Sequence, residues 1–240
     1  MLTLLLIFLL TICAAFIQRV SGFGFGIFVM MFFPYFLPSY GQATMLSGLL
    51  AGSTAVIIVA KYWKQIQWRL MIPLLAVNIV ASYIAIEYMA SLSNNAVKRY
   101  FGIMFVLIAL FFLFCDKKVH VPQNRATNGI IGMLSGIMGG MFAMPGPPLV
   151  LYYINIIKEK TAYVATIQAF SVILNIFYTL FRAQVGFLGD DIPLWWCAGI
   201  AGALIGTSIG TRFFERISSN ALRKIVYIFL MISGMSAIIF

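Results

Sequence analysis

Charged residues are scarce in this sequence, and so are residues that bind metals or form disulfides. Only 9% of its 240 residues are charged, whereas soluble domains have about 25%. It has one histidine, His120, and three cysteines, Cys13, Cys115 and Cys197, in or at the edge of different apolar runs. This spacing suits neither a metal cage nor a disulfide framework, so we expect no metal and no cofactor. It also speaks against a membrane enzyme or a thiol relay, which would need a nucleophile, a metal cluster or paired carboxylates.

Apolar residues, in contrast, are in large excess. Hydrophobic residues make up 62% of the chain, and the mean hydropathy is +1.02. No soluble core of this size would bury so much apolar surface, so the surrounding solvent must be lipid. The first 18 residues lack a basic start and a small-residue cleavage site. Met1–Gln18 is therefore expected to be retained as a helix and not removed as a signal peptide.

Ten apolar runs predict an all-α polytopic membrane protein, since a spanning helix needs about 20 apolar residues. The expected domains are a first repeat at 1–115, a cytoplasmic linker at 116–127 and a second repeat at 128–240. The runs are 2–18, 24–38, 42–60, 70–90 and 99–115 in the first repeat, and 128–143, 147–157, 162–181, 192–211 and 224–240 in the second. Runs 24–38 and 147–157 are short for an apolar core of about 30 Å.

The distribution of basic residues predicts the orientation of the chain. The net charge of +10 would fit a nucleic-acid partner on a soluble protein, but no basic stripe is present, so none is expected. If the segments alternate and the linker is cytoplasmic, only Lys98, Arg99 and Arg182 of the 16 basic residues lie outside. This bias predicts a bacterial inner-membrane protein with both termini in the periplasm.

Two matches within the chain indicate a duplication. Ser21–Gly26 matches Ser135–Gly140 at a shift of 114 residues, and Leu92–Arg99 matches Ile217–Lys224 at a shift of 125. An insertion at Gly186–Asp191 would account for the difference. A duplicated unit of five segments must insert its second copy upside down, so we expect inverted repeats. If one short run were only a kink in its neighbour, the repeats would instead be parallel.

Each repeat contains a Gly- or Pro-rich break in an apolar stretch. Such breaks free backbone groups that lipid cannot satisfy, so the two should form short helix hairpins that meet inside the bundle, near the membrane midplane. Half-helices that begin there would point N–H groups and positive dipole ends inward, which favours an anion. The candidate substrate-binding residues at the breaks are Ser21, Gly22, Gly24, Gly26, Ser135, Gly136, Gly139, Gly140, Pro145, Gly146 and Pro147.

Close helix packing is the alternative role for these glycines. It fits Gly48 and Gly52, and also Gly202, Gly206 and Gly210, which recur at every fourth position. It does not fit the proline-rich stretch Pro145–Pro148, because proline does not promote close packing.

Polar residues inside the segments complete the predicted site. Gln168, Ser171 and Asn175 share one helix face. Gln42 and Gln168 lie at equivalent points near the starts of runs 42–60 and 162–181. Neutral amides and hydroxyls can bind an anion, although interhelical hydrogen bonding is the alternative. Arg182 is a further candidate, either as an anion ligand or as a residue anchored at the interface. Glu87 would carry a coupling proton if buried, or face the outer surface.

The breaks and the duplicated arrangement resemble the TauE/SafE family of sulfite and sulfonate permeases. The resemblance rests on Ser21–Gly26 with Pro34 and on Ser135–Gly140 with Pro145–Pro148. It implies a secondary carrier that moves a small anionic sulfur or carboxylate compound, commonly as an exporter, with proton coupling as one option. Phe23 and Phe25 depart from the more glycine-rich family pattern, which leaves the substrate open.

The leading hypothesis is therefore a carrier that works by alternating access, with a small anion and membrane lipid as partners. An anion channel is the alternative, and a membrane-embedded enzyme is a weaker one. The oligomeric state is left open by the sequence, with a homodimer as one option.

Overall fold

The computed structural model describes residues 1–114 and 122–213, and all regular structure there is helical. The first half contains α1 (Leu2–Ser21), α2 (Phe25–Met30), α3 (Phe33–Phe36), α4 (Tyr40–Tyr62), a 3-10 turn (Trp63–Gln65), α5 (Trp68–Ala90) and α6 (Asn94–Phe114). The second contains α7 (Arg125–Phe142), α8 (Gly146–Ile156), α9 (Lys160–Gln184) and α10 (Ile192–Phe213). Helices cover most of each predicted run from 2–18 to 192–211, but run 24–38 is divided between α2 and α3. Run 224–240 and linker residues 116–121 lie outside the described residues.

The chain forms a multi-pass membrane protein. Within the described ranges, α1, α4, α5, α9 and α10 are long and apolar enough to cross a membrane. Their outer faces carry large apolar side chains, such as Val80 and Ile84 on α5, both 62% exposed. Lipid, not water, is the solvent in which such faces are stable.

Polar side chains mark the starts of three long helices. Ser39 accepts a hydrogen bond from the Gln42 backbone N–H, and Asn124 accepts one from that of Thr127. Glu159 accepts from the N–H groups of Thr161 and Ala162 at the start of α9. These side chains satisfy N–H groups that have no partner within a helix, which fixes where α4, α7 and α9 begin.

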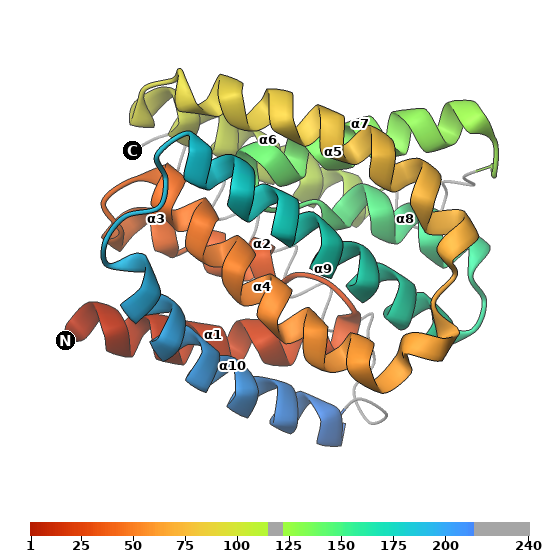
Figure 1. The fold of residues 1–240 in the computed structure, drawn as a ribbon, viewed down its shortest axis with the longest axis horizontal. Coiled ribbons are helices and arrows are strands. Elements are labelled where there is room, and N and C mark those ends of the chain that lie inside the picture. Colours follow the sequence, from red (N-terminus) through yellow and green to blue (C-terminus); the bar gives the residue numbers. More distant parts are fainter. Residues whose placement is uncertain (115–121, 214–240) are drawn as a thin grey trace.

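The long helices pack in pairs, and each pair joins a helix of the first half to a helix of the second half. The most extensive contacts are α1 with α10, α5 with α7, and α4 with α9. In Figure 1, α4 and α9 run side by side through the centre, the α1–α10 pair lies below them, and the α5–α7 pair lies above. By position in the two repeats, α1 corresponds to α7 and α5 corresponds to α10. Each outer pair then joins the first helix of one repeat to the equivalent of α5 in the other. A two-fold relation between the halves would produce this pairing.

Both outer pairs are held together by a row of glycines on a helix of the second half. On α10, a Cβ at Gly202 or Gly206 would overlap the carbonyl oxygen of Phe8 or Ile12 on α1. On α7, a Cβ at Gly136 would come within 2.7 Å of the Asn78 carbonyl oxygen on α5, and one at Gly140 within 2.7 Å of that of Ser82. The backbones therefore approach more closely than any side chain would permit.

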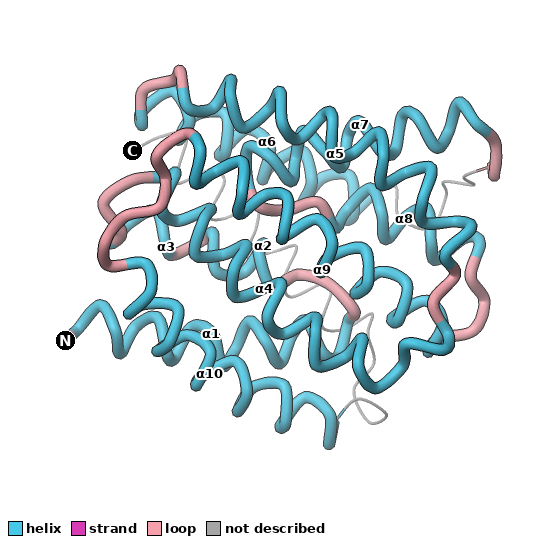
Figure 2. Tube along the Cα trace, in the orientation of Figure 1, coloured by secondary structure: helices cyan, strands magenta, loops and turns pink. Residues whose placement is uncertain are grey.

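The hairpins that contain the two breaks open toward opposite ends of the bundle. Figure 1 shows the start of α1 and the end of α3 at the left, and the start of α7 and the end of α8 at the right. The tube in Figure 2 shows that a loop, and not helix, links α1 to α2. The short runs are therefore separate helices and not kinks in their neighbours.

We predict that Gly206→Ala lowers the thermal stability of the detergent-solubilised protein, by an amount equivalent to about 1–3 kcal/mol. Its methyl group would overlap the Ile12 carbonyl oxygen and push α10 away from α1. Thermal unfolding monitored by fluorescence-detected size exclusion measures the effect. Gly129→Ala is the matched control, because a Cβ there has no neighbour within 4 Å. Equal stability of the two variants would contradict close packing at Gly206.

Candidate substrate-binding site

The two breaks begin in the same way, with a left-handed residue directly after the first helix. α1 ends at Ser21 and is followed by Gly22, with φ 82°; α2 begins at Phe25. α7 ends at Phe142 and is followed by Ala143, with φ 57°; α8 begins at Gly146. Left-handed backbone at the end of a helix is a common way to turn the chain out of it. The helix ends thus correspond at a shift of 121 residues, and not at the 114 that the sequence match indicated.

The two breaks touch each other inside the bundle, as the sequence predicts. A Cβ at Gly26, in the first turn of α2, would overlap the carbonyl oxygen of Ala143. On the other side, a Cβ at Gly146 would lie 3.5 Å from the Cβ of Phe23. Only the missing side chain of Gly26 allows this approach of one backbone to the other.

A small cavity lies where the breaks meet, and the volume open to water is about 60 Å³. It is lined by Gly22–Ile27 from the first break and Ala143–Gly146 from the second. Ala51 and Ser171, which lie near the midpoints of α4 and α9, also line it. The cavity is therefore near the middle of the bundle.

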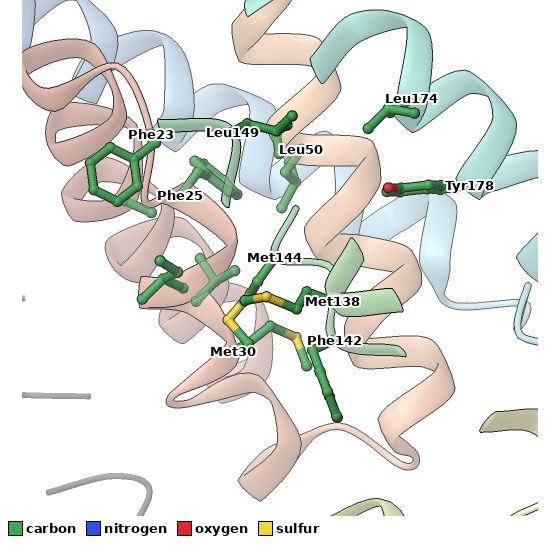
Figure 3. Packing of buried hydrophobic residues seen from close by; sticks show 14 of the residues in the cluster. Phe23, Phe25, Met30, Leu50, Met138, Phe142, Met144, Leu149, Leu174 and Tyr178 are labelled. Atoms are coloured by element: carbon green, nitrogen blue, oxygen red, sulfur yellow. The ribbon is translucent and has the colours of Figure 1, made fainter. Parts of the chain in front are cut away.

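The cavity has polar and apolar walls. Its polar side chains are Gln18, Gln168, Ser171 and Asn175, the last three from one face of α9. Its apolar side chains include Phe23, Phe25, Met144 and Leu149. In Figure 3, Phe23 and Phe25 extend from the first break. A few convergent polar groups in an apolar hollow are typical of a small-molecule site.

Buried amides connect the first break to α1, α4 and α9. The Gln168 side chain donates a hydrogen bond of 3.0 Å to the Gly22 carbonyl oxygen and accepts one of 3.0 Å from the Gln18 amide. The side-chain oxygen of Gln18 in turn accepts a hydrogen bond of 2.7 Å from the Thr54 hydroxyl. Gln168 therefore partners a carbonyl at the turn that lipid would leave without a donor.

A second polar chain supports the other break. The Tyr178 hydroxyl donates to the Asn78 side-chain oxygen at 2.8 Å, and the Asn78 amide donates to Ser135 at 2.9 Å. Ser135 then donates to the Pro145 carbonyl oxygen at 2.8 Å. The Arg182 guanidinium donates to the carbonyl oxygens of Gly139 and Gly140, at 2.7 and 3.0 Å. A cation at the end of α7 complements the negative end of the helix dipole.

The structure brings about half of the predicted site residues to the cavity. Those that line it are Gly22, Gly24, Gly26, Pro145, Gly146, Gln168, Ser171 and Asn175. Ser21 ends α1 next to the turn. Ser135 supports the second break from behind, through its hydrogen bond to Pro145.

Gln42 and several glycines do not line the cavity. Gln42 lies in the first turn of α4, beside Gly189, about nine residues along the helix from Ala51. Gly136 and Gly140 form the contact with α5, and a Cβ at Gly139 would overlap the Tyr178 hydroxyl. Packing, the alternative role, thus accounts for these three positions. Pro147 is buried in the first turn of α8 and is not among the lining residues.

Arg182 is not anchored at the interface, because its side chain is completely buried. The same face of α9 carries Gln168, Ser171, Asn175, Tyr178 and Arg182 at alternating steps of three and four residues. Extension of the predicted polar stripe by one heptad would have found Arg182 from the sequence. Gln18 and Asn78 were missed, since one stands at the end of an apolar run and the other is isolated within one.

Acidic and metal-binding residues do not gather in the described part of the chain. Every Asp and Glu that the structure describes is exposed, Glu87 included. In residues 1–114 and 122–213, no three His, Cys, Asp or Glu side chains are grouped to hold a metal ion. Glu87 therefore has the surface position that was its alternative role.

Comparison with known proteins relates nearly the whole chain to one family. Residues 7–237 match the family model described as sulfite exporter TauE/SafE. A protein of Cupriavidus necator, described as a probable sulfite/organosulfonate exporter TauE, is 24% identical over 216 residues, which cover 88% of this chain and 84% of that protein. No solved structure matches the chain.

We predict that Gly26→Ala reduces the activity of the protein strongly, while Gly146→Ala changes it little. The first methyl group would overlap the Ala143 carbonyl oxygen and separate the breaks, whereas the second would make ordinary contact with Phe23. The measurement is solute flux into proteoliposomes with matched amounts of folded protein. Gly140→Leu is a poor probe of the cavity, since it would disrupt the contact of α7 with α5. Equal flux in the two alanine variants would show that contact between the breaks is not required.

Proposed function

The chain belongs to the TauE/SafE family of membrane transporters, and on this basis we propose that it moves a small anion, sulfite or an organosulfonate, out of the cell. The observation that carries the proposal is the single cavity formed by both breaks and by the amides of Gln18, Gln168 and Asn175. The related protein of Cupriavidus necator, whose name refers to the same compounds, supports this substrate class.

The lining of the cavity suits a small anion. α8 begins at the cavity wall and points its N-terminal end, with its partial positive charge, toward the interior. Amide N–H groups and the Ser171 hydroxyl are donors that carry no charge of their own. Each would donate a hydrogen bond to a sulfite or sulfonate oxygen.

Alternating access follows from an inverted arrangement of the halves. The arrangement is supported by the hairpins, which open toward opposite ends of the bundle (Figure 1), and by the exchanged pairs α1–α10 and α5–α7. In such a carrier, one hairpin would move to open the cavity to one side while the other keeps it closed. The methionines Met30, Met138 and Met144 gather beside Phe142 (Figure 3), and their flexible side chains would adapt to this movement.

The proposed orientation places the ends of α4 and α8 in the cytoplasm of a bacterial inner membrane. Basic residues at that end of the bundle include Lys61, Lys64, Arg69, Lys158 and Lys160. The loop between α9 and α10, at the opposite end, carries Asp190 and Asp191. The excess of basic residues on one side supports a cytoplasmic location of that side.

We predict that proteoliposomes with the wild-type protein exchange sulfite or ethanesulfonate with saturable kinetics. A carrier must bind its substrate before it moves, so preloaded unlabelled anion should accelerate uptake of the labelled anion. Sulfate and acetate complete the panel, and protein-free liposomes are the control. Ohmic currents without counterflow would indicate a channel, and an absence of flux for every anion would refute the proposed transport.

We further predict the sidedness of two loops by cysteine labelling. In a variant with Cys13, Cys115 and Cys197 replaced by serine, Leu188→Cys should react with a membrane-impermeant maleimide in intact cells. Gln123→Cys, before α7, should react only after the membrane is opened. Both positions are exposed, so access is decided by the side of the membrane. The reverse pattern would overturn the proposed orientation.

A further inference from the structure

Arg182 is a buried cation that lacks a charged partner among the residues that the structure describes. Its side chain is 0% exposed, and no described carboxylate pairs with it, because every described Asp and Glu is at the surface. Burial of an unpaired charge in a protein interior costs roughly several kcal/mol. Such a residue is therefore rarely retained without a counter-charge or a function.

The contact with α7 accounts for only part of the Arg182 side chain. Its Nη2 donates to the Gly139 and Gly140 carbonyl oxygens, and the guanidinium lies 5.3 Å from the centroid of the Tyr178 ring. The end of α7 supplies a partial negative charge equivalent to about half an elementary charge. Nε and Nη1, which together carry three N–H bonds, have no hydrogen-bond acceptor in the described structure. A capping role therefore leaves two nitrogens and much of the charge unused.

The Nη1 of Arg182, which has no acceptor, lies against Gly48 of α4. A Cβ at Gly48 would lie 3.1 Å from Nη1 of Arg182 and 3.0 Å from the side-chain oxygen of Asn175. Gly48 therefore leaves room at the place where these two groups converge. Beside it on α4, Ser47 is completely buried, and its hydroxyl has no partner in the described structure.

Gly48 and Asn175 also line a groove that lies beside the cavity between the breaks. Asn175 lines that cavity as well. The groove lies between α4 and α9, has a volume of about 340 Å³ and includes Gly52. The groove is otherwise mostly apolar, and Ile176 and Leu180 on its rim are 57% and 55% exposed. The polar end thus lies deep in the bundle, and the apolar end lies toward the lipid.

We propose that Arg182 is the counter-charge of the transported anion, which binds Nε and Nη1 beside Gly48 and Asn175. This proposal rests on the proposed function and specifies its substrate class. The guanidinium would bind the oxyanion group, since Arg pairs well with such groups. The apolar groove would receive a short hydrocarbon tail, so organosulfonates with two to four carbons should bind at least as well as sulfite.

The same guanidinium links the anion to the second hairpin. Nη2 donates to the last turn of α7, and Nη1 of the same guanidinium lies against Gly48 of α4. An anion that draws the guanidinium toward Gly48 would weaken its hold on the Gly139 and Gly140 carbonyls. Binding of the anion would then loosen the α7–α8 break, which belongs to the hairpin proposed to move.

The decisive experiment compares Arg182→Lys and Arg182→Gln with Arg125→Gln, which removes an exposed charge at the start of α7. Binding is read as the rise in Tm caused by sulfite or ethanesulfonate in detergent, and transport as KM and kcat in proteoliposomes. Arg182→Lys should raise KM about tenfold or more, and Arg182→Gln should abolish the ligand-induced rise in Tm. Arg125→Gln should behave as the wild type. An unchanged KM, or an unchanged rise in Tm, in folded Arg182 variants would overturn the proposal.

Gly48→Ala keeps the proposal testable if Arg182→Gln fails to fold. Its methyl group would stand 3.1 Å from Nη1 and leave the hydrogen bonds to Gly139 and Gly140 in place. KM should rise several-fold with little change in the Tm of the ligand-free protein, and a wild-type KM would contradict the assigned site. A wild-type protein that binds ethanesulfonate but does not transport it would refute the carrier function and leave the Arg182 site standing.

Discussion

Each helix break inside a membrane frees backbone groups for which lipid has no hydrogen bonds. Much of this structure follows from how those groups are satisfied. At the first break the Gly22 carbonyl accepts from Gln168, and at the second the Gly139 and Gly140 carbonyls accept from Arg182. Both donors stand on α9. This helix must therefore pass both breaks, which brings the breaks together at one place near the middle of the bundle.

The two central helices, α4 and α9, carry complementary residues at their contact: small ones on α4 and large polar ones on α9. α9 contributes long polar side chains on one face, and α4 contributes Gly48 and Gly52, which leave space for them. The close approach of Gly26 to Ala143 adds a backbone contact between the hairpins. Neither hairpin can shift far without an effect on the other, as the proposed alternating access requires.

Apolar run length and Gly/Pro content predicted the long helices and both breaks in the described part of the chain, because lipid tolerates little else. The division of run 24–38 into α2 and α3 was not predicted. The roles of single glycines were not predictable in the same way. Gly22 supplies a left-handed turn, while Gly136 and Gly140 supply close packing, and a match of glycine to glycine aligned residues with different roles. The burial of Arg182 was also missed, since its place near the end of an apolar run looks like that of an anchor. Only its position on the face of Asn175 and Gln168 reveals it.

The pairing of α1 with α10 has a consequence for how the chain is made. α1 is synthesised first, and its partner follows after some 190 residues, so α1 must wait in the membrane without the helix it packs against. Its mean hydropathy of 2.2 is the highest of the candidate spans, which suits a helix that is stable alone in lipid. The glycine row that receives it stands on α10, and the late helix thus completes a contact for which the early one needs no special surface. Assembly of this pair therefore waits for α10, which docks on a helix that is already in the membrane.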